Sequence, residues 1–234
     1  MATFVLVHGA FHGGWCYSRV ARLLRAAGHD VYTPTLTGLG ERAHLSTAAV
    51  NLSLHIEDVA SVLRCEELSD VVLCGHSYGG MVITGVAAIE GARVRTLVYL
   101  DAIVPSDGQS LFDVIGAEAT AHTVTSARGD SRVPSLPPEF FNVNSADVGW
   151  VERRCVPQPI GTFIEAVRMT GQEESIKNRT FILAKNYGFM LNRATFDRLS
   201  EDPTWRTIAI DAGHDVMIDA PHELAEALIE EVGR

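Results

Sequence analysis

The sequence predicts an α/β fold, in which a mostly parallel central sheet carries helices on both faces. Three observations lead to this prediction. Short apolar runs alternate with amphipathic segments, the apolar runs are continuous, and 234 residues of 47% hydrophobic composition suffice for one large core. Strands that are apolar on both faces are typical of a parallel sheet covered by helices on its two sides.

The first half of the chain shows this alternation clearly. Residues 3–7 (TFVLV) have the composition of a buried strand, and residues 15–28 place Val20, Leu23 and Leu24 on one helical face. The elements expected next are a strand at 29–34, a helix at 52–68, a strand at 71–75, a helix at 81–92 and a strand at 94–102.

The second half resumes the alternation after a long interruption. Its expected elements are strands at 180–184 and 205–211, a helix at 194–202 between them, and a final helix at 220–232. The stretch 105–178 is rich in Pro, Ser, Gly and aromatic residues, and an insertion that long is usually functional. We therefore expect a core made of residues 1–104 and 179–234. A cap, residues 105–178, would follow the strand that ends near Asp101 and lie over the carboxyl edge of the sheet.

Composition excludes several classes of partner. The formal net charge of −10 argues against nucleic acid, which needs a basic face. The N-terminus lacks a basic region, and no apolar run is long enough to span a membrane. We expect a cytoplasmic protein without a metal or cofactor. A homodimer is compatible with an exposed cap, although no pattern requires one. The cysteines show no metal-ligand spacing; they are Cys16, Cys65, Cys74 and Cys155.

The strongest motif is Gly75-His76-Ser77-Tyr78-Gly79, which follows the apolar run VVLC and precedes an apolar helix. A strand that turns sharply into a helix strains the residue at the turn. Side chains two residues before and after it would collide, so glycine occupies both places. This context favours a nucleophile elbow that exposes the Ser77 hydroxyl above the sheet, over a serine that merely packs in a glycine-rich turn.

A serine hydroxyl becomes a good nucleophile only when a base takes its proton. His214 follows the last expected strand, so it lies at the same sheet edge as the serine, and it comes late in the chain, as the order Ser–acid–His requires. His29 and His222 fit helix ends, and His122 lies in the expected cap. We expect His76 to pack or hydrogen-bond beneath the elbow. His214 is therefore the predicted base.

The acid that orients the imidazole is less clearly marked. We favour Asp101, which ends a strand at the same sheet edge. The position where this acid usually stands, after the strand at 180–184, holds the neutral Asn186. Asp197 lies inside an expected helix, and Asp211 is only three residues from His214. The alternative is that Asp101 caps the start of the insertion while Asn186 holds the histidine.

The oxyanion of an acyl-transfer reaction needs donors already in place. We expect the backbone N–H groups of Tyr78 and Ala10 to supply them, with Phe11 as the fallback. Aromatic residues of the loop and cap are expected to line an apolar substrate pocket, although the alternative for the cap aromatics is that they form its own core. The expected pocket residues are Phe11, Tyr78, Phe112, Phe141 and Trp150, and Phe140 and Phe163 are further candidates in the cap.

The segments FVLVHGAFHGGWCY, AAGHDVYTPTLTGLGERAHL, VVLCGHSYGGMV and LVYLDAIVP together resemble the α/β-hydrolase superfamily. Within it, the chain is similar to the small esterase branch of plant methylesterases, hydroxynitrile lyases and bacterial EstC-like and pyrethroid-hydrolase-like carboxylesterases. The resemblance covers nearly the whole chain. It implies that Ser77 is the nucleophile and His214 the base, and that the amides of Ala10 and Tyr78 form the oxyanion hole. Asn186 departs from the family, whose members commonly have an aspartate there.

The lyases of this group carry a threonine and a lysine where this chain has Gly9 and Asp215, so lyase activity is not expected. The features predict instead a serine hydrolase that cleaves a small, fairly apolar carboxylic ester through an acyl-enzyme on Ser77. An amide, carbamate, lactone or thioester would use the same groups. Two other classes stay open: a cofactor-free dioxygenase with a His/Asp base, and a non-catalytic receptor for a small ligand.

Overall fold

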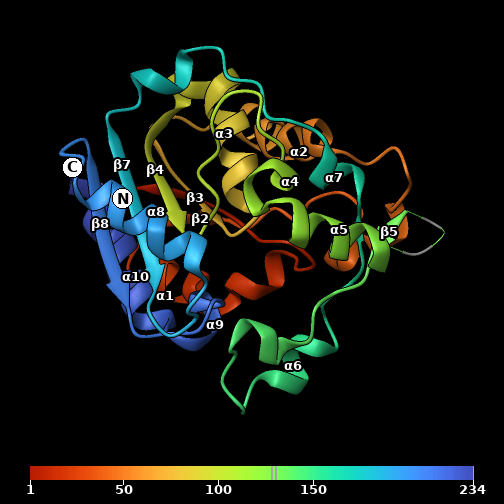
Figure 1. Cartoon of the computed structure of the whole chain (residues 1–234). Coiled ribbons are helices and arrows are strands. Elements are labelled where there is room, and N and C mark those ends of the chain that lie inside the picture. Colours follow the sequence, from red (N-terminus) through yellow and green to blue (C-terminus); the bar gives the residue numbers. More distant parts are fainter. Residues whose placement is uncertain (128, 130, 234) are drawn as a thin grey trace.

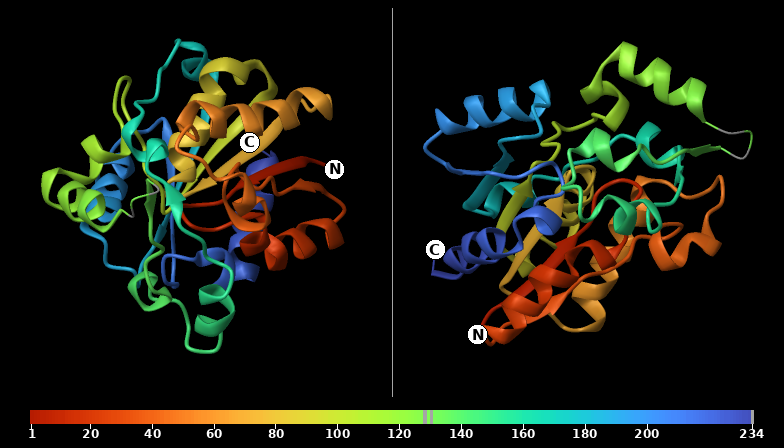
Figure 2. Two further views of the ribbon diagram at one scale, coloured as in Figure 1. Left: turned by 90° about the vertical axis from the view of Figure 1, so that its right-hand side faces the viewer. Right: turned by 90° about the horizontal axis from the view of Figure 1, so that it is seen from below.

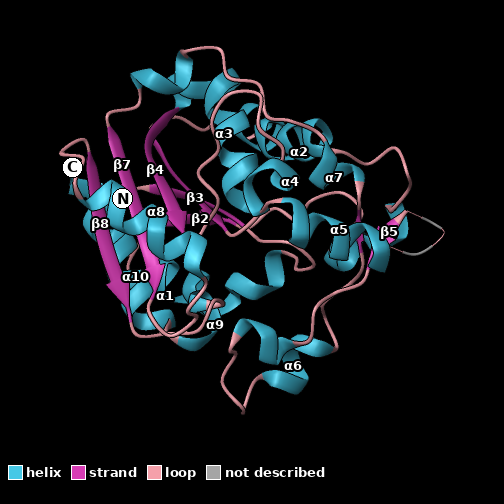
Figure 3. Ribbon diagram, viewed as in Figure 1, coloured by secondary structure: helices cyan, strands magenta, loops and turns pink. Residues whose placement is uncertain are grey.

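Six strands form one sheet in the order β2-β1-β3-β4-β7-β8, and every neighbouring pair is parallel (Figures 1 and 3). The alternation of apolar runs and helices thus predicted the sheet correctly. The strands are β1 (Thr3–Val7), β2 (Asp30–Tyr32), β3 (Val71–His76), β4 (Val94–Leu100), β7 (Asn178–Ala184) and β8 (Trp205–Ile210).

This computed structural model describes residues 1–127, 129 and 131–233. Residues 128 and 130 of the expected cap, and residue 234 of the expected core, lie outside the described residues. No helix within the described ranges combines the length and the apolar character that crossing a bilayer requires.

Helices cover the sheet on both faces. α2 (Leu52–Cys65) packs against α3 (Gly79–Glu90), and α1 (Ser18–Ala26) packs against α10 (Pro221–Glu230). The two pairs lie on opposite sides of the sheet, as Figure 2 shows from two directions. α8 (Met190–Ser200) connects β7 to β8 and begins before the helix expected at 194–202.

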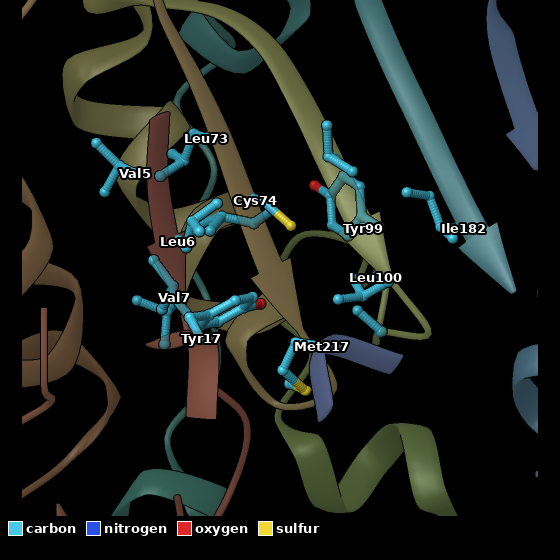
Figure 4. Packing of buried hydrophobic residues seen from close by; sticks show 14 of the residues in the cluster. Val5, Leu6, Val7, Tyr17, Leu73, Cys74, Tyr99, Leu100, Ile182 and Met217 are labelled. Carbon is cyan, nitrogen blue, oxygen red and sulfur yellow. The ribbon is translucent and has the colours of Figure 1, made fainter. Parts of the chain in front are cut away.

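The core lies between these layers. All six residues of β3 are buried, which agrees with its continuous apolar sequence. Figure 4 shows Leu73 and Cys74 of this strand among the side chains of its neighbours, with Tyr17 and Met217 joining the cluster. Cys74 is fully buried, as expected of a free thiol that behaves as a small apolar side chain.

The segment between β4 and β7 contains short elements that its sequence did not predict. They are α4 (Leu111–Ile115), α5 (Ala117–Ser126), α6 (Val148–Glu152), α7 (Gly161–Ile164), and a two-stranded antiparallel sheet of β5 (Arg132–Val133) and β6 (Gln158–Pro159). Three of these helices have only four or five residues, too few for a periodic pattern to be visible. α4 begins at a capping box in which Ser110 and Asp113 satisfy each other's backbone N–H groups.

The remaining helical turns are also short. They are α9 (Val216–Asp219) and the 3-10 helices η1 (Gly14–Tyr17), η2 (Gly40–Leu45), η3 (Gly91–Arg93), η4 (Pro138–Phe141), η5 (Gln172–Ser175) and η6 (Glu231–Gly233).

The register of the sheet brings its functional loops together. Val7 of β1 lies beside Gly75 of β3, and His76 lies beside Leu100 of β4. Leu100 in turn lies beside Ile182 of β7. The residues that directly follow β1, β3 and β4 therefore meet at one edge of the sheet, where ligands bind in open α/β folds.

Candidate active site

The turn after β3 has the backbone of a nucleophile elbow. Ser77 has a φ of 53°, a conformation that L-residues rarely adopt. A Cβ atom at Gly75 would lie 2.5 Å from the carbonyl oxygen of Gly79, and one at Gly79 would lie 2.8 Å from that of Val7. Glycine is therefore required at both places. The N–H of Ser77 donates to the carbonyl of Leu100 at 3.2 Å, which helps to hold the strained turn.

Asp101 and His214 are in direct contact. Oδ2 of Asp101 lies 2.6 Å from Nδ1 of His214, and both side chains are almost completely buried. The second oxygen, Oδ1, accepts the N–H of Ala184 at 3.2 Å. Because a carboxylate only accepts hydrogen bonds, Nδ1 of His214 carries a proton, so that in the neutral ring Nε2 holds the lone pair. That tautomer is the one that can act as a base toward a hydroxyl.

The other carboxylates weighed as the acid lie elsewhere. Asp197 pairs with Arg193 on the exposed face of α8, and Asp211 pairs with Lys185. Asn186 is exposed, and its backbone N–H donates to the carbonyl of Ala212 at 3.0 Å. The acidic group that the structure brings to His214 is the one at the end of β4.

Three further groups hold His214. Its backbone N–H donates to the carbonyl of Phe141 at 2.9 Å, and its own carbonyl accepts Nε2–H of His76 at 2.9 Å. The ring of Tyr187 stacks on the imidazole, with 4.3 Å between centroids and 26° between planes. Sequence reasoning did not find Tyr187. Its position just after the expected strand at 180–184 would have placed it at the same edge of the sheet as His214.

The loop after β1 is fixed by two histidine side chains. Nδ1–H of His8 donates to the carbonyl of Gly9 at 2.8 Å, and Nδ1–H of His12 donates to the carbonyl of Ala10 at 2.7 Å. These bonds hold the peptide groups on both sides of Ala10. Burial is the main influence that lowers the pKa of His8 to about 3, so this histidine is neutral at pH 7.

The structure distinguishes between the N–H groups of Ala10 and Phe11, the two candidates for the second donor of an oxyanion hole beside Tyr78. The N–H of Phe11 donates to Oε1 of Gln158 at 2.8 Å and is therefore already used. This hydrogen bond excludes the N–H of Phe11 as an oxyanion donor, so the N–H of Ala10 is the candidate on this loop. Tyr78 stands directly before α3, where the first N–H groups of a helix lack partners within the helix.

The Tyr78 side chain is anchored away from this amide. Its hydroxyl donates to Nδ1 of His55 at 3.0 Å, and Nε2–H of His55 donates to the carbonyl of Thr37 at 2.8 Å. Burial is the main influence that lowers the pKa of His55 to about 4, which keeps the ring neutral and its Nδ1 free to accept.

Ser77, Asp101 and His214 all line one cavity of about 750 Å³. Ala10 also lines it, as do five of the aromatic residues considered for the pocket: Phe11, Tyr78, Phe140, Phe141 and Phe163. Tyr187 and Phe189 also lie on its wall.

Phe112 and Trp150, which were also expected in the substrate pocket, are not among the described residues that line this cavity. Phe112 packs behind the wall, with its ring 6.0 Å from that of Phe163. The guanidinium groups of Arg19 and Arg154 lie over the ring of Trp150, with their Cζ atoms 5.4 and 4.8 Å from its centroid. Aromatic character alone does not indicate which side of a cap segment faces the cavity.

Within residues 1–127, 129 and 131–233, no group of three or more His, Cys, Asp or Glu side chains is arranged to hold a metal ion.

Comparison with known proteins now gives the family. The model of the alpha/beta hydrolase family matches residues 4–227. The chain is 45% identical, over 97% of its length and 98% of the relative's, to the carbendazim hydrolyzing esterase of Nocardioides sp. strain SG-4G. It is also 38% identical over 106 residues to the pyrethroid hydrolase of Sphingobium wenxiniae, which is 44% of this chain and 37% of that protein.

Solved structures agree. A pyrethroid hydrolase from Sphingobium faniae JZ-2 is similar with a TM-score of 0.76 and 25% identity, covering 99% of this chain and 97% of that one. An extracellular alpha/beta-hydrolase from a Paenibacillus species shares the fold with a TM-score of 0.84 and 24% identity, covering 99% of both chains. The chain therefore belongs to the alpha/beta hydrolase family, in the branch of small esterases predicted from its motifs.

Proposed function

We propose that this protein hydrolyses small, fairly apolar carboxylic esters through an acyl-enzyme on Ser77. The observation that carries the proposal is the 2.6 Å contact between Asp101 and His214, on the wall of the same cavity as the strained Ser77 turn. A nucleophile, a base in the correct tautomer and a buried carboxylate are the three parts that acyl transfer by serine requires. An esterase relative that matches nearly the full chain supports the same reaction.

The proposed cycle begins when Nε2 of His214 takes the proton of Ser77 Oγ, and Oγ attacks the ester carbonyl carbon. The N–H groups of Ala10 and Tyr78 donate to the resulting oxyanion, while Asp101 stabilises the imidazolium. The imidazolium then protonates the leaving alkoxide, and the alcohol departs. Water, deprotonated by His214, attacks the acyl-enzyme and releases the carboxylic acid.

The cavity supports a substrate with apolar acyl and alcohol groups, because aromatic side chains such as Phe141, Phe163 and Phe189 form much of its wall. Two relatives are named for the hydrolysis of carbendazim and of pyrethroids. We include carbendazim among the proposed substrates because that relative matches nearly the whole chain.

We also propose that residues 105–178 act as the cap of this site. Leu111, Leu136, Phe141 and Phe163 all come from this stretch and line the cavity, which supports the assignment. Free thiols at all four cysteines support a reducing location such as the cytoplasm. A homodimer remains a further proposal, to be tested by the mass of the protein in solution.

The test is turnover of p-nitrophenyl, methyl and aromatic esters and of carbendazim by the wild type and by Ser77→Ala. We expect the variant to lose at least about 10⁴-fold in kcat. A fluorophosphonate should label the wild type at Ser77 and leave the variant unlabelled. Oxygen-dependent turnover that survives Ser77→Ala would instead indicate a dioxygenase. Ligand binding without labelling or turnover would indicate a receptor.

A further inference from the structure

A second histidine–aspartate pair lies beneath the proposed active site. Nε2 of His12 is 3.1 Å from Oδ2 of Asp215, although the two residues are 203 positions apart in the chain. The two side chains are only 2% and 0% exposed. Neither residue is among the described residues that line the cavity, so neither is placed to touch a substrate. Buried ion pairs are a weak source of stability, which raises the question of what this one does.

The hydrogen bonds of His12 define its charge. Nδ1 faces the carbonyl oxygen of Ala10, and Nε2 faces the carboxylate of Asp215. These two oxygens only accept hydrogen bonds, so both ring nitrogens carry protons and the ring is an imidazolium. The sulfur of Cys155 lies farther from Nε2, at 3.9 Å. The indole of Trp15 stacks on this cation, with 5.2 Å between centroids and 22° between planes.

The electrostatic surroundings agree with this charge state. Burial alone would lower the pKa of His12, but the neighbouring carboxylate of Asp215 raises it well above its usual value. Burial likewise opposes ionisation of Asp215, yet His12 brings the pKa of that carboxyl down to about 2. A cation and an anion thus face each other in the protein interior at neutral pH.

Each partner is joined to a different functional loop. His12 donates to the carbonyl of Ala10, whose own N–H is the proposed oxyanion donor. The next residue, Phe11, has a φ of 67°, so this part of the loop is strained and needs bonds to hold it. Asp215 directly follows His214 in the chain and therefore anchors the loop that carries the proposed base.

A third histidine closes the network. Burial is the main influence that lowers the pKa of His76 well below its usual value, so the ring is neutral. It donates Nε2–H to the carbonyl of His214 at 2.9 Å, and the same nitrogen lies 3.9 Å from Oδ1 of Asp215. Since His76 directly precedes Ser77, the network contacts the loops after β1, β3 and β8.

We propose that the His12–Asp215 ion pair is a positioning element. It holds the backbone N–H of Ala10, the proposed oxyanion donor, in place relative to the loop that carries His214. The inference rests on the proposed ester hydrolysis and assigns no catalytic role to the pair, which acts through Ala10 and His214. A donor that stabilises only the oxyanion affects the transition state more than substrate binding. Disruption of the pair therefore lowers kcat and leaves KM nearly unchanged.

The test uses two substitutions of His12 that differ in where they keep a donor. His12→Gln retains a donor near the position of Nε2, toward Asp215, but none for the carbonyl of Ala10. His12→Asn retains a donor near the position of Nδ1, toward Ala10. Asp215→Asn removes the negative charge. The matched controls are His222→Gln and Asp211→Asn, which make the same changes at exposed positions.

We expect His12→Gln to lose about 10² in kcat with KM within threefold of the wild type. The kcat of His12→Asn should be at least about fivefold higher than that of His12→Gln, and the kcat of Asp215→Asn should be about tenfold lower than that of the wild type. Binding of a trifluoromethyl ketone, whose adduct with Ser77 places an oxyanion in the site, should weaken in parallel with kcat. Binding of the product acid should not. Each rate is divided by the concentration of active sites, measured as the protein that a fluorophosphonate has labelled when the labelling reaction is complete. Unfolded molecules are not labelled and therefore do not affect the result.

If His12→Gln does not fold, the test uses His12→Asn and Asp215→Asn. In both variants kcat should fall while KM stays within threefold of the wild type. Equal losses in kcat for His12→Gln and His12→Asn would overturn the inference, as would rates per labelled site within twofold of the controls. A wild type that neither labels nor turns over esters would overturn the proposed function instead, so the two failures are distinguishable.

Discussion

Nδ1 of His214 and Oδ2 of Asp101 lie 2.6 Å apart across 113 residues of sequence. The contact forms because β4 and β7 are neighbours in the sheet, so that the residue after β4 reaches the edge where the loop after β8 returns. Asp101 itself has a φ of 43°, and Asn192 donates Nδ2–H to its carbonyl at 2.9 Å. The proposed acid of this site therefore follows β4, and the position after β7 is free to be the neutral Asn186.

The first prediction concerns this carboxylate. Asp101→Asn should lower kcat for ester hydrolysis by about 10⁴, because an amide can donate to Nδ1 and so favour the wrong tautomer of His214. Steady-state kinetics with a p-nitrophenyl ester measures the change. Asn186→Asp is the matched control: that side chain is exposed, so we expect rates within about twofold of the wild type. Undiminished turnover in Asp101→Asn would remove the residue from the proposed triad.

Much of this arrangement was predictable from local sequence, because it depends on local backbone geometry. Ser77 lies in a strained turn, and the glycines at positions 75 and 79 indicate this turn in the sequence. Asp101 and the loop of His214 follow expected strands, and parallel strands end at the same edge.

Other features depend on contacts between distant segments and leave no local pattern. The pairing of His12 with Asp215 joins the two ends of the chain, and neither neighbourhood indicates it. The stacking of Tyr187 on His214 and the position of Trp150 away from the cavity depend on the path of segments between the strands. These segments contain short elements without periodicity, so the side of each that faces the site could not be predicted.

The second prediction concerns Gly9. A Cβ atom there would lie 2.7 Å from Nδ1 of His76 and 2.9 Å from Cβ of Ser77, so even alanine must displace Ser77 or His76. We expect Gly9→Ala to lose about 10² in kcat, the effect of a displacement of about 1 Å. Gly233→Ala is the control, since its Cβ would meet nothing within 4 Å. A Gly9→Ala variant with wild-type kcat would show that the turn at Ser77 can relax.

The same crowding bears on hydroxynitrile lyase activity. Gly9→Thr should abolish ester hydrolysis without creating cyanide release from a cyanohydrin, because the hydroxyl has no room beside His76 and position 215 holds an anion in place of a lysine. Cyanide production is measured colorimetrically with mandelonitrile. Lyase turnover by this single variant above the rate without enzyme would contradict the steric argument.

The third prediction concerns stability in acid. Burial is the main influence that lowers the pKa of His55 to about 4, against about 6.5 in an unfolded chain. Between these two pH values the unfolded state binds more protons than the folded state. The free energy of unfolding therefore falls as the pH falls from 6.5 toward 4, by up to about 1.4 kcal/mol per pH unit for this one group. His8 acts in the same direction.

Urea unfolding of wild type and His55→Gln at several pH values between 4.5 and 6.5 tests this. The variant removes one buried neutral histidine, so its unfolding free energy should depend less steeply on pH than that of the wild type. His222→Gln, at an exposed histidine on α10, should keep the wild-type slope. Equal slopes in all three proteins would mean that His55 is protonated as easily in the folded state as in the unfolded one.

The last prediction concerns the ring that stacks on the proposed base. Tyr187 lies 4.3 Å from His214 between ring centroids, and Phe141 covers the imidazole at 5.7 Å. Aromatic pairs of this kind contribute about 0.5–1.5 kcal/mol beyond their buried area, which corresponds to as much as about tenfold in rate if the contact holds the imidazole in its reactive orientation. Tyr187→Ala should therefore lose up to about tenfold in kcat/KM, whereas Tyr187→Phe keeps the ring and should stay within about twofold. If Tyr187→Phe loses as much as Tyr187→Ala, the phenol hydroxyl rather than the stacked ring is the active part, and the orienting role assigned to the stacking is wrong.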